Sequence, residues 1–75
     1  LVANGYSYFN NGRVGIGTTS PSAPLEISST IGGIILPRMT NAQRNAISPT
    51  RGEMLFSDTD NKFYGYDGTN WVALH

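Results

Sequence analysis

The stretch GEMLFSDTDNKFYGYDGTNWVAL, Gly52–Leu74, contains three short apolar runs separated by polar links. The runs cover residues 53–57, 62–66 and 71–74, and apolar runs of this length bounded by turn residues are typical of β-strands. The two links are rich in Asp, Asn and Gly, which favour tight turns. Because such short connections favour antiparallel neighbours, we expect a three-stranded antiparallel meander, with Gly65 as a candidate bulge.

A short helix is predicted before the meander. Thr40 fits an N-cap, and Gln43 can reach back to the backbone of Thr40 to complete a capping box. Pro49 restricts the residue before it and removes a backbone donor, so it ends the helix. The expected helix covers residues 41–47.

The N-terminal part predicts a β-hairpin followed by an extended connector. Residues 6–9 and 13–16 are short runs on either side of an Asn-Gly step, which tolerates the positive φ angles of a tight turn. Gly15 and Gly17 flank Ile16, so another backbone can approach closely there. Residues 18–24 are too polar and proline-rich for a strand interior and predict the connector.

Two further segments carry strand patterns. Leu25-Glu26-Ile27 alternates apolar and polar residues, as a half-buried strand does. Ile34-Ile35-Leu36 places large apolar side chains on both faces of a strand, because successive residues point to opposite sides. A single small sheet covers one face and not both, so this run predicts burial by something beyond the chain's own sheet.

Length and composition point to the same conclusion. A domain of 75 residues usually needs disulfides, a metal or a partner chain to be stable. The sequence has no cysteine, and its single histidine, His75, cannot form a histidine metal cluster. Oligomerisation is the remaining means of stabilisation. The first residues, Leu1-Val2-Ala3, lack the features of a signal peptide and are expected to lie within a longer protein.

Charge and hydropathy exclude two classes of partner. The five basic residues are scattered and balanced by five acidic ones, so no basic surface for nucleic acid is expected. No apolar stretch approaches the roughly 20 residues that cross a bilayer, so no membrane insertion is expected.

The candidate binding and catalytic sites in this sequence have simpler structural explanations. Asp58, Asp60 and Asn61 could supply oxygen ligands to Ca²⁺, but the loop lacks the Gly and the distant bidentate Glu of an EF-hand, so turn formation is favoured. Gly15-Ile16-Gly17 is only a fragment of a nucleotide-binding loop, without a Lys. Besides His75, the sequence has no second histidine to serve as a base or a ligand. We therefore predict no metal, no cofactor, no catalytic residue and no enzymatic activity.

Three segments resemble phage tail fibre proteins and bacterial surface proteins of similar build, and together they cover most of the chain from Gly12 onward. They are Gly12–Pro21 with the pattern G-x-V-G-I-G-T-x-x-P, Ile35–Thr40 containing L-P-R-M-T and followed by Ala42-Gln43-Arg44 and Ile47, and Gly52–Phe56 followed by Asp58–Lys62 and Tyr66–Trp71. The resemblance implies an elongated, parallel homotrimeric fibre on a virion tail or a bacterial surface.

The expected fold is mainly β with one short helix, an N-terminal hairpin and a C-terminal antiparallel meander, intertwined in a homotrimeric fibre. Residues 1–75 would form a single fibre module, with the hairpin and connector in 1–24 and the strand, helix and meander in 25–75. The expected function is structural trimerisation that contributes to host attachment. The predicted trimer interface contains Ile16, Ile34, Ile35 and Leu36.

The alternative function is a receptor-binding or carbohydrate-binding fibre tip. Tyr64, Tyr66 and Trp71 are the candidate ligand-facing aromatics, although large aromatic residues more often fill a core or an interface. The expected partners are further copies of the chain and neighbouring fibre segments, with a host cell-surface glycan or protein as the partner of a tip.

Overall fold

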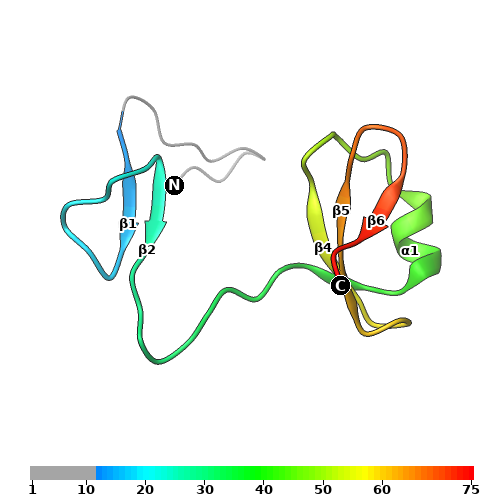
Figure 1. Cartoon of the computed structure of the whole chain (residues 1–75), viewed down its shortest axis with the longest axis horizontal. Helices are drawn as coiled ribbons and strands as arrows, with labels where there is room; N and C mark the ends of the chain where they lie inside the picture. Colours follow the sequence, from blue (N-terminus) through cyan, green and yellow to red (C-terminus); the bar gives the residue numbers. More distant parts are fainter. Residues whose placement is uncertain (1–11) are drawn as a thin grey trace, which may run out of the picture. The chain divides into compact units, whose positions relative to one another are not determined.

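The computed structural model describes residues 12–75, which contain six strands and one helix (Figure 1). The mainly β fold with one short helix is confirmed. The chain divides into two compact units, Leu1–Gly33 and Ile34–His75. The expected single module, with its parts divided after residue 24, stays a prediction.

The first unit contains a two-stranded parallel ladder. Strand β1, Val14–Ile16, pairs with β2, Leu25–Ile27, so the strand predicted at 25–27 is confirmed. The other strand of the expected hairpin, residues 6–9, lies outside the described residues. Gly17 has a φ of +81°, and a Cβ there would collide with the carbonyl oxygen of Ser28. Glycine is therefore required where the chain turns out of β1.

The second unit contains a four-stranded sheet in the order β3-β4-β5-β6. Strands β4, β5 and β6 form the predicted antiparallel meander, and β3 pairs in parallel with β4. Gly65 pairs regularly with Met54 on one side and Val72 on the other, so the candidate bulge is not formed. The four strands are Arg38–Met39 (β3), Met54–Ser57 (β4), Lys62–Tyr66 (β5) and Trp71–Ala73 (β6).

The edge strand β3 begins later than the apolar run suggested. Ile34-Ile35-Leu36 lies outside any strand, and the first backbone hydrogen bond between this segment and β4 runs from the Phe56 N–H to the Pro37 carbonyl. Proline has no N–H to contribute to a ladder, so regular pairing starts only after it.

Helix α1, Asn41–Ala46, starts with the predicted capping box. The Thr40 hydroxyl accepts from the Gln43 N–H, and the Gln43 side chain accepts from the Thr40 N–H at 2.9 Å. The helix ends one residue earlier than predicted, because Ile47 is already extended ahead of Ser48 and Pro49.

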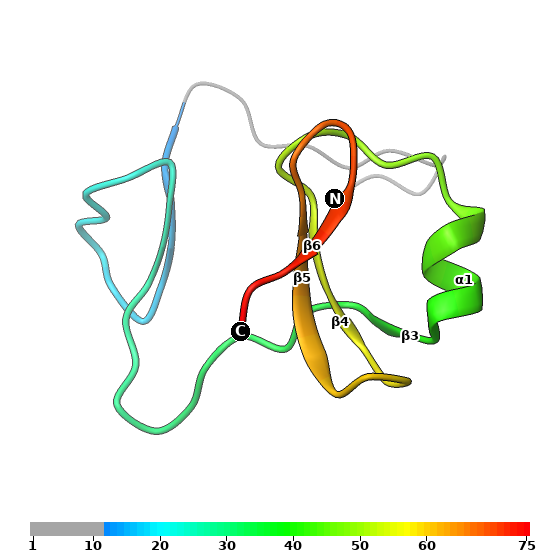
Figure 2. The ribbon, with the colours of Figure 1, turned by 45° about the vertical axis from the view of Figure 1, so that its right-hand side comes forward.

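Strand register divides the side chains of this sheet between two faces. Helix α1 lies to one side of the sheet (Figure 2), and we call that side the covered face and the opposite side the open face. The covered face carries Met39, Leu55, Ser57, Lys62, Tyr64, Tyr66, Trp71 and Ala73. The open face carries Arg38, Met54, Phe56, Phe63, Gly65 and Val72.

A polar network attaches α1 to the covered face. Asn41 accepts from the Ser57 hydroxyl at 2.7 Å and donates to the Asp60 carboxylate at 3.0 Å. The Tyr64 hydroxyl donates to the other oxygen of Asp60. These bonds, that from Tyr64 first and that from Asn41 second, hold the pKa of Asp60 below its ordinary value.

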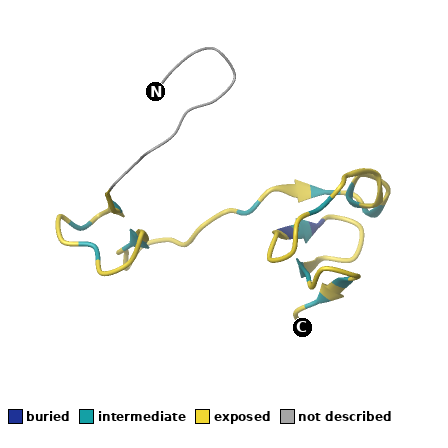
Figure 3. Cartoon of the chain, turned by 90° about the horizontal axis from the view of Figure 1, so that it is seen from above, coloured by how far each residue is buried: buried dark blue, intermediate teal, exposed yellow. Residues whose placement is uncertain are grey.

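The core beside this network is very small. Among residues 12–75, Leu55 is the one buried apolar residue, 1% exposed, and Ser57 is the one buried polar residue. Figure 3 shows that the buried positions lie in β4. A core of this size explains why the second unit relies on the capping box and the Asp60 network to hold its helix.

Replacing Leu55 with Ala should lower the free energy of unfolding by about 2–5 kcal/mol, because a fully buried leucine leaves a cavity when it is truncated. Urea denaturation at one fixed protein concentration measures the change. Ile31→Ala is the matched control, since Ile31 is 97% exposed. Equal losses in the two variants would contradict a core centred on Leu55.

Asp60 should contribute stability that is lost in acid. A carboxyl group with a lowered folded pKa stabilises the fold above its unfolded pKa of about 3.9, and the contribution disappears as pH falls through the folded pKa. Asp60→Asn and Tyr64→Phe should both lose less unfolding free energy between pH 7 and pH 3 than the wild type does. An unchanged pH dependence in both variants would disprove this role.

Candidate self-association surface

The centre of the open face is an aromatic pair from neighbouring strands. Phe56 of β4 and Phe63 of β5 are register partners, with ring centroids 4.9 Å apart and planes inclined by 70°. This edge-to-face arrangement is a favourable one for aromatic rings. Phe63 is nevertheless 41% exposed, and Met54 beside the pair is also exposed. Two large aromatic side chains therefore meet each other on a surface that the described chain covers only in part.

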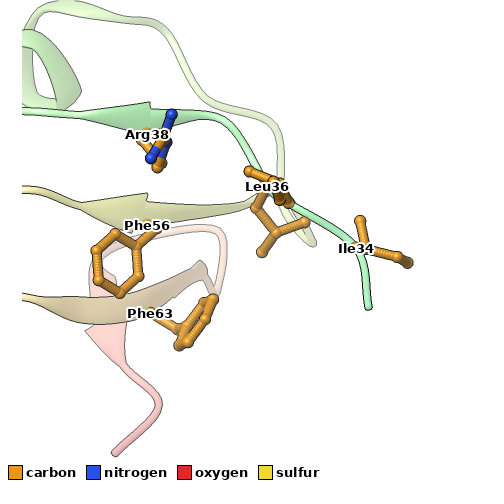
Figure 4. Close-up of a pocket in the computed structure, with 6 residues that line it drawn as sticks. Ile34, Leu36, Arg38, Phe56 and Phe63 are labelled. Carbon is orange, nitrogen blue, oxygen red and sulfur yellow. The ribbon is translucent and has the colours of Figure 1, made fainter. Parts of the chain in front are cut away.

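The segment before β3 lines a pocket next to this pair. Ile34, Ile35 and Leu36 lie along it, and Arg38, Phe56 and Phe63 complete its wall (Figure 4). Ile35 is 81% exposed and Ile34 is also exposed, whereas Leu36 is half-buried. The pocket is thus an apolar hollow bordered by apolar side chains that face water.

The chain after β6 extends the open face. The Leu74 side chain lies against Gly65, where a Cβ would meet it at 3.5 Å, and the Leu74 N–H donates to the Phe63 carbonyl. The His75 ring packs against the Phe63 ring with centroids 5.6 Å apart, and its Nε2 accepts from the Phe63 N–H. Gly65 leaves room for Leu74, so the surface continues to this end of the sheet.

The first unit has a face of the same kind. The parallel register places Val14, Ile16, Leu25 and Ile27 on one face of the ladder, and Ile16 and Leu25 are exposed. On the other face, the loop between the strands packs over Gly15, and Ser22 donates twice to the Glu26 carboxylate, from its N–H and its hydroxyl. Each unit therefore covers one face with its own chain and exposes an apolar face.

The predicted ligand-facing aromatics lie together on the covered face. Tyr66 and Trp71 are register partners with ring centroids 5.2 Å apart, and the Arg44 guanidinium lies 4.4 Å above the Tyr64 ring. All three aromatic residues are half-buried. Their role as ligand-facing residues stays a prediction.

The turn beside the Tyr66–Trp71 pair is held by its own carboxylate. Asp67 accepts from the N–H groups of Asn70 and Thr69, and these two bonds, in that order, lower the pKa of its carboxyl group.

Residues 12–75 contain no cluster of three or more metal-ligating His, Asp or Glu side chains. Within the same residues, no helix has both the length and the apolar character required to span a bilayer.

Sequence reasoning missed most of the open face. The predicted interface residues Ile34, Ile35 and Leu36 lie together at the pocket, and Ile16 lies in the other unit. The missed residues are Met54, Phe56, Phe63, Val72 and Leu74. The signal that could have found them is the period of two along the meander, which puts Phe56 and Phe63 on one face once the register of the hairpin is fixed.

One comparison with known proteins agrees with this geometry. A family model described as the phage tail like trimerisation region matches residues 15–75, which include the open face and all of the first unit's apolar face except Val14. Comparison with curated proteins and with solved structures gave no match. Because the family model covers most of the sequence, the chain belongs to the family of phage tail like trimerisation regions.

Proposed function

We propose that three parallel copies of this chain associate through their open faces and so hold the chains of a tail fibre together. The role is structural, and its chemistry is the burial of apolar surface between copies. The observation that carries it is the contrast between the two faces of one sheet: the covered face has its own helix, and the open face exposes Phe63 and Met54.

The energetics favour association over an isolated chain. Fully burying a large apolar side chain is worth about 1.5–3 kcal/mol. The open face and the segment before β3 together offer eight exposed or half-exposed residues of this type on each copy. They are Ile34, Ile35, Leu36, Met54, Phe56, Phe63, Val72 and Leu74. A unit whose buried core is little more than Leu55 gains most of its stability by covering these residues with another copy.

The predicted interface residues fit this scheme as contacts between copies. Ile34, Ile35 and Leu36 form one side of the pocket, where side chains of a second copy would insert. Ile16 would contribute in the same way from the exposed face of the first unit. The number of copies follows from the family, and the parallel arrangement follows because every chain of a fibre must run from one end to the other.

The module would act in host attachment only indirectly, by holding three chains in register for the parts of the fibre that meet the host. Its proposed location is the tail fibre of a virion, and its partners are two further copies of the chain and the fibre segments on either side. Neither a metal nor a cofactor takes part.

The test is an Ile35→Asp variant studied by sedimentation equilibrium and circular dichroism. The wild-type chain should sediment as a trimer. Because Ile35 is 81% exposed in one copy, the substitution removes little packing from the isolated chain, but in the trimer it buries three carboxylates in an apolar interface. The variant should lose the trimer and, with it, its cooperative melt.

Ile31→Asp is the matched control, since it makes the same substitution at an even more exposed position four residues earlier. It should remain trimeric. A wild-type chain that is a compact monomer, with a melting temperature independent of concentration, would refute the proposed function.

A further inference from the structure

Arg38 is the one charged side chain that lines the open-face pocket. It is the register partner of Phe56 on the neighbouring strand, and Leu36 precedes it along the wall of the same pocket (Figure 4). Phe63 lies one strand further away, on β5. Within residues 12–75, its guanidinium forms neither an ion pair nor a hydrogen bond with the protein. In the single copy, water solvates this charge because the residue is exposed.

Assembly changes the surroundings of Arg38. If a second copy covers the open face, as the proposed function requires, the guanidinium loses water, and an isolated buried charge is strongly unfavourable. An arginine can remain ionised in an interface when a carboxylate accepts its hydrogen bonds. An assembled open face therefore needs an anionic partner for each copy of Arg38.

The chain has five acidic side chains, and four already accept hydrogen bonds within their own copy. Glu26 accepts from Ser22, and Glu53 accepts from the Thr50 N–H. Asp60 is held by Asn41 and Tyr64, and Asp67 closes its own turn. In the described structure, the remaining carboxylate, Asp58, accepts no hydrogen bond and forms no ion pair.

Asp58 also lies at the edge of the same surface. It follows β4 directly, two residues after Phe56, and its N–H donates to the Met39 carbonyl at 2.8 Å. It therefore lies beside the end of β3, the strand that carries Arg38. The two opposite charges are close in the sheet without being paired, so each can face a neighbouring copy.

We propose that Arg38 of each copy pairs with Asp58 of the next copy, so that a trimer contains three identical ion pairs. This inference rests on the proposed function and adds the identity of two residues that contact each other between neighbouring copies. A contact between two different surface patches closes into a ring when the rotation between copies is 120°, and the third pair then forms automatically. The pairs would fix the rotation and the axial register of the apolar faces, which apolar contacts alone specify weakly.

Charge exchange tests the pairing. Arg38→Glu and Asp58→Arg each place like charges together at every interface, so each should raise the concentration at which half of the chain is trimeric by about thirty-fold or more. The double variant Arg38→Glu/Asp58→Arg restores three opposite pairs and should assemble near the wild-type concentration. Sedimentation equilibrium over a concentration series measures all three.

Arg51→Glu is the control for net charge, because it makes the same change at an arginine that packs near Gly68 and does not line the pocket. It should assemble like the wild type. Mixing the two single variants gives a further signature: a ring of three contains an odd number of contacts, so at least one like-charge contact remains and assembly recovers only in part.

The outcomes separate this inference from the proposed function. A monomeric wild type would refute both. A trimeric wild type with a single variant that assembles normally would refute the pairing alone, as would a double variant that assembles no better than the single variants. In particular, normal assembly of Asp58→Arg would mean that another group, such as a bound anion, neutralises Arg38.

Discussion

A four-stranded sheet has two faces, and the second unit has only one short helix with which to cover them. Helix α1 has six residues, and the chain places it against one side. The strands still place apolar side chains on the opposite face, so the sheet needs a covering layer on both faces while the second unit supplies one on a single face. The small core, the exposed pair of phenylalanines and the need for further copies all follow from this shortage.

The two faces differ in the interactions that they use. On the covered face, α1 is attached by directional bonds, from Asn41 to Ser57 and Asp60, and these give a short helix one fixed position. The open face is almost entirely apolar, which suits a contact that forms between separate chains after each sheet has folded. The hydrogen bonds that a copy makes within itself thus lie on the covered face, and the apolar side chains that other copies bury lie on the open face of the same sheet.

The sequence predicted the local elements because local residues determine them. The Asp-rich and Asn-rich links gave the meander, and Thr40 with Gln43 gave the helix start. The parallel pairings of β1 with β2 and of β3 with β4 depend on contacts between distant segments, for which short motifs carry no signal.

The open face could not be predicted for a related reason, since placing Phe56 opposite Phe63 requires the register of the hairpin and not only its existence. Three consecutive apolar residues at Ile34–Leu36 correctly marked surface in need of a partner, but Pro37 keeps them out of the strand.

A threefold assembly makes the open face more demanding than the covered face. Each residue there occurs three times around one axis, so an unfavourable contact is repeated at every interface. Apolar residues such as Val72 and Leu74 tolerate this repetition because their burial is favourable without a specific partner. A charged residue does not tolerate this repetition, because the free-energy cost of removing it from water must be offset at each of the three interfaces. The presence of Arg38 among apolar side chains is therefore most simply explained by a partner of opposite charge, and the threefold symmetry of the assembly repeats that partner at each of the three interfaces.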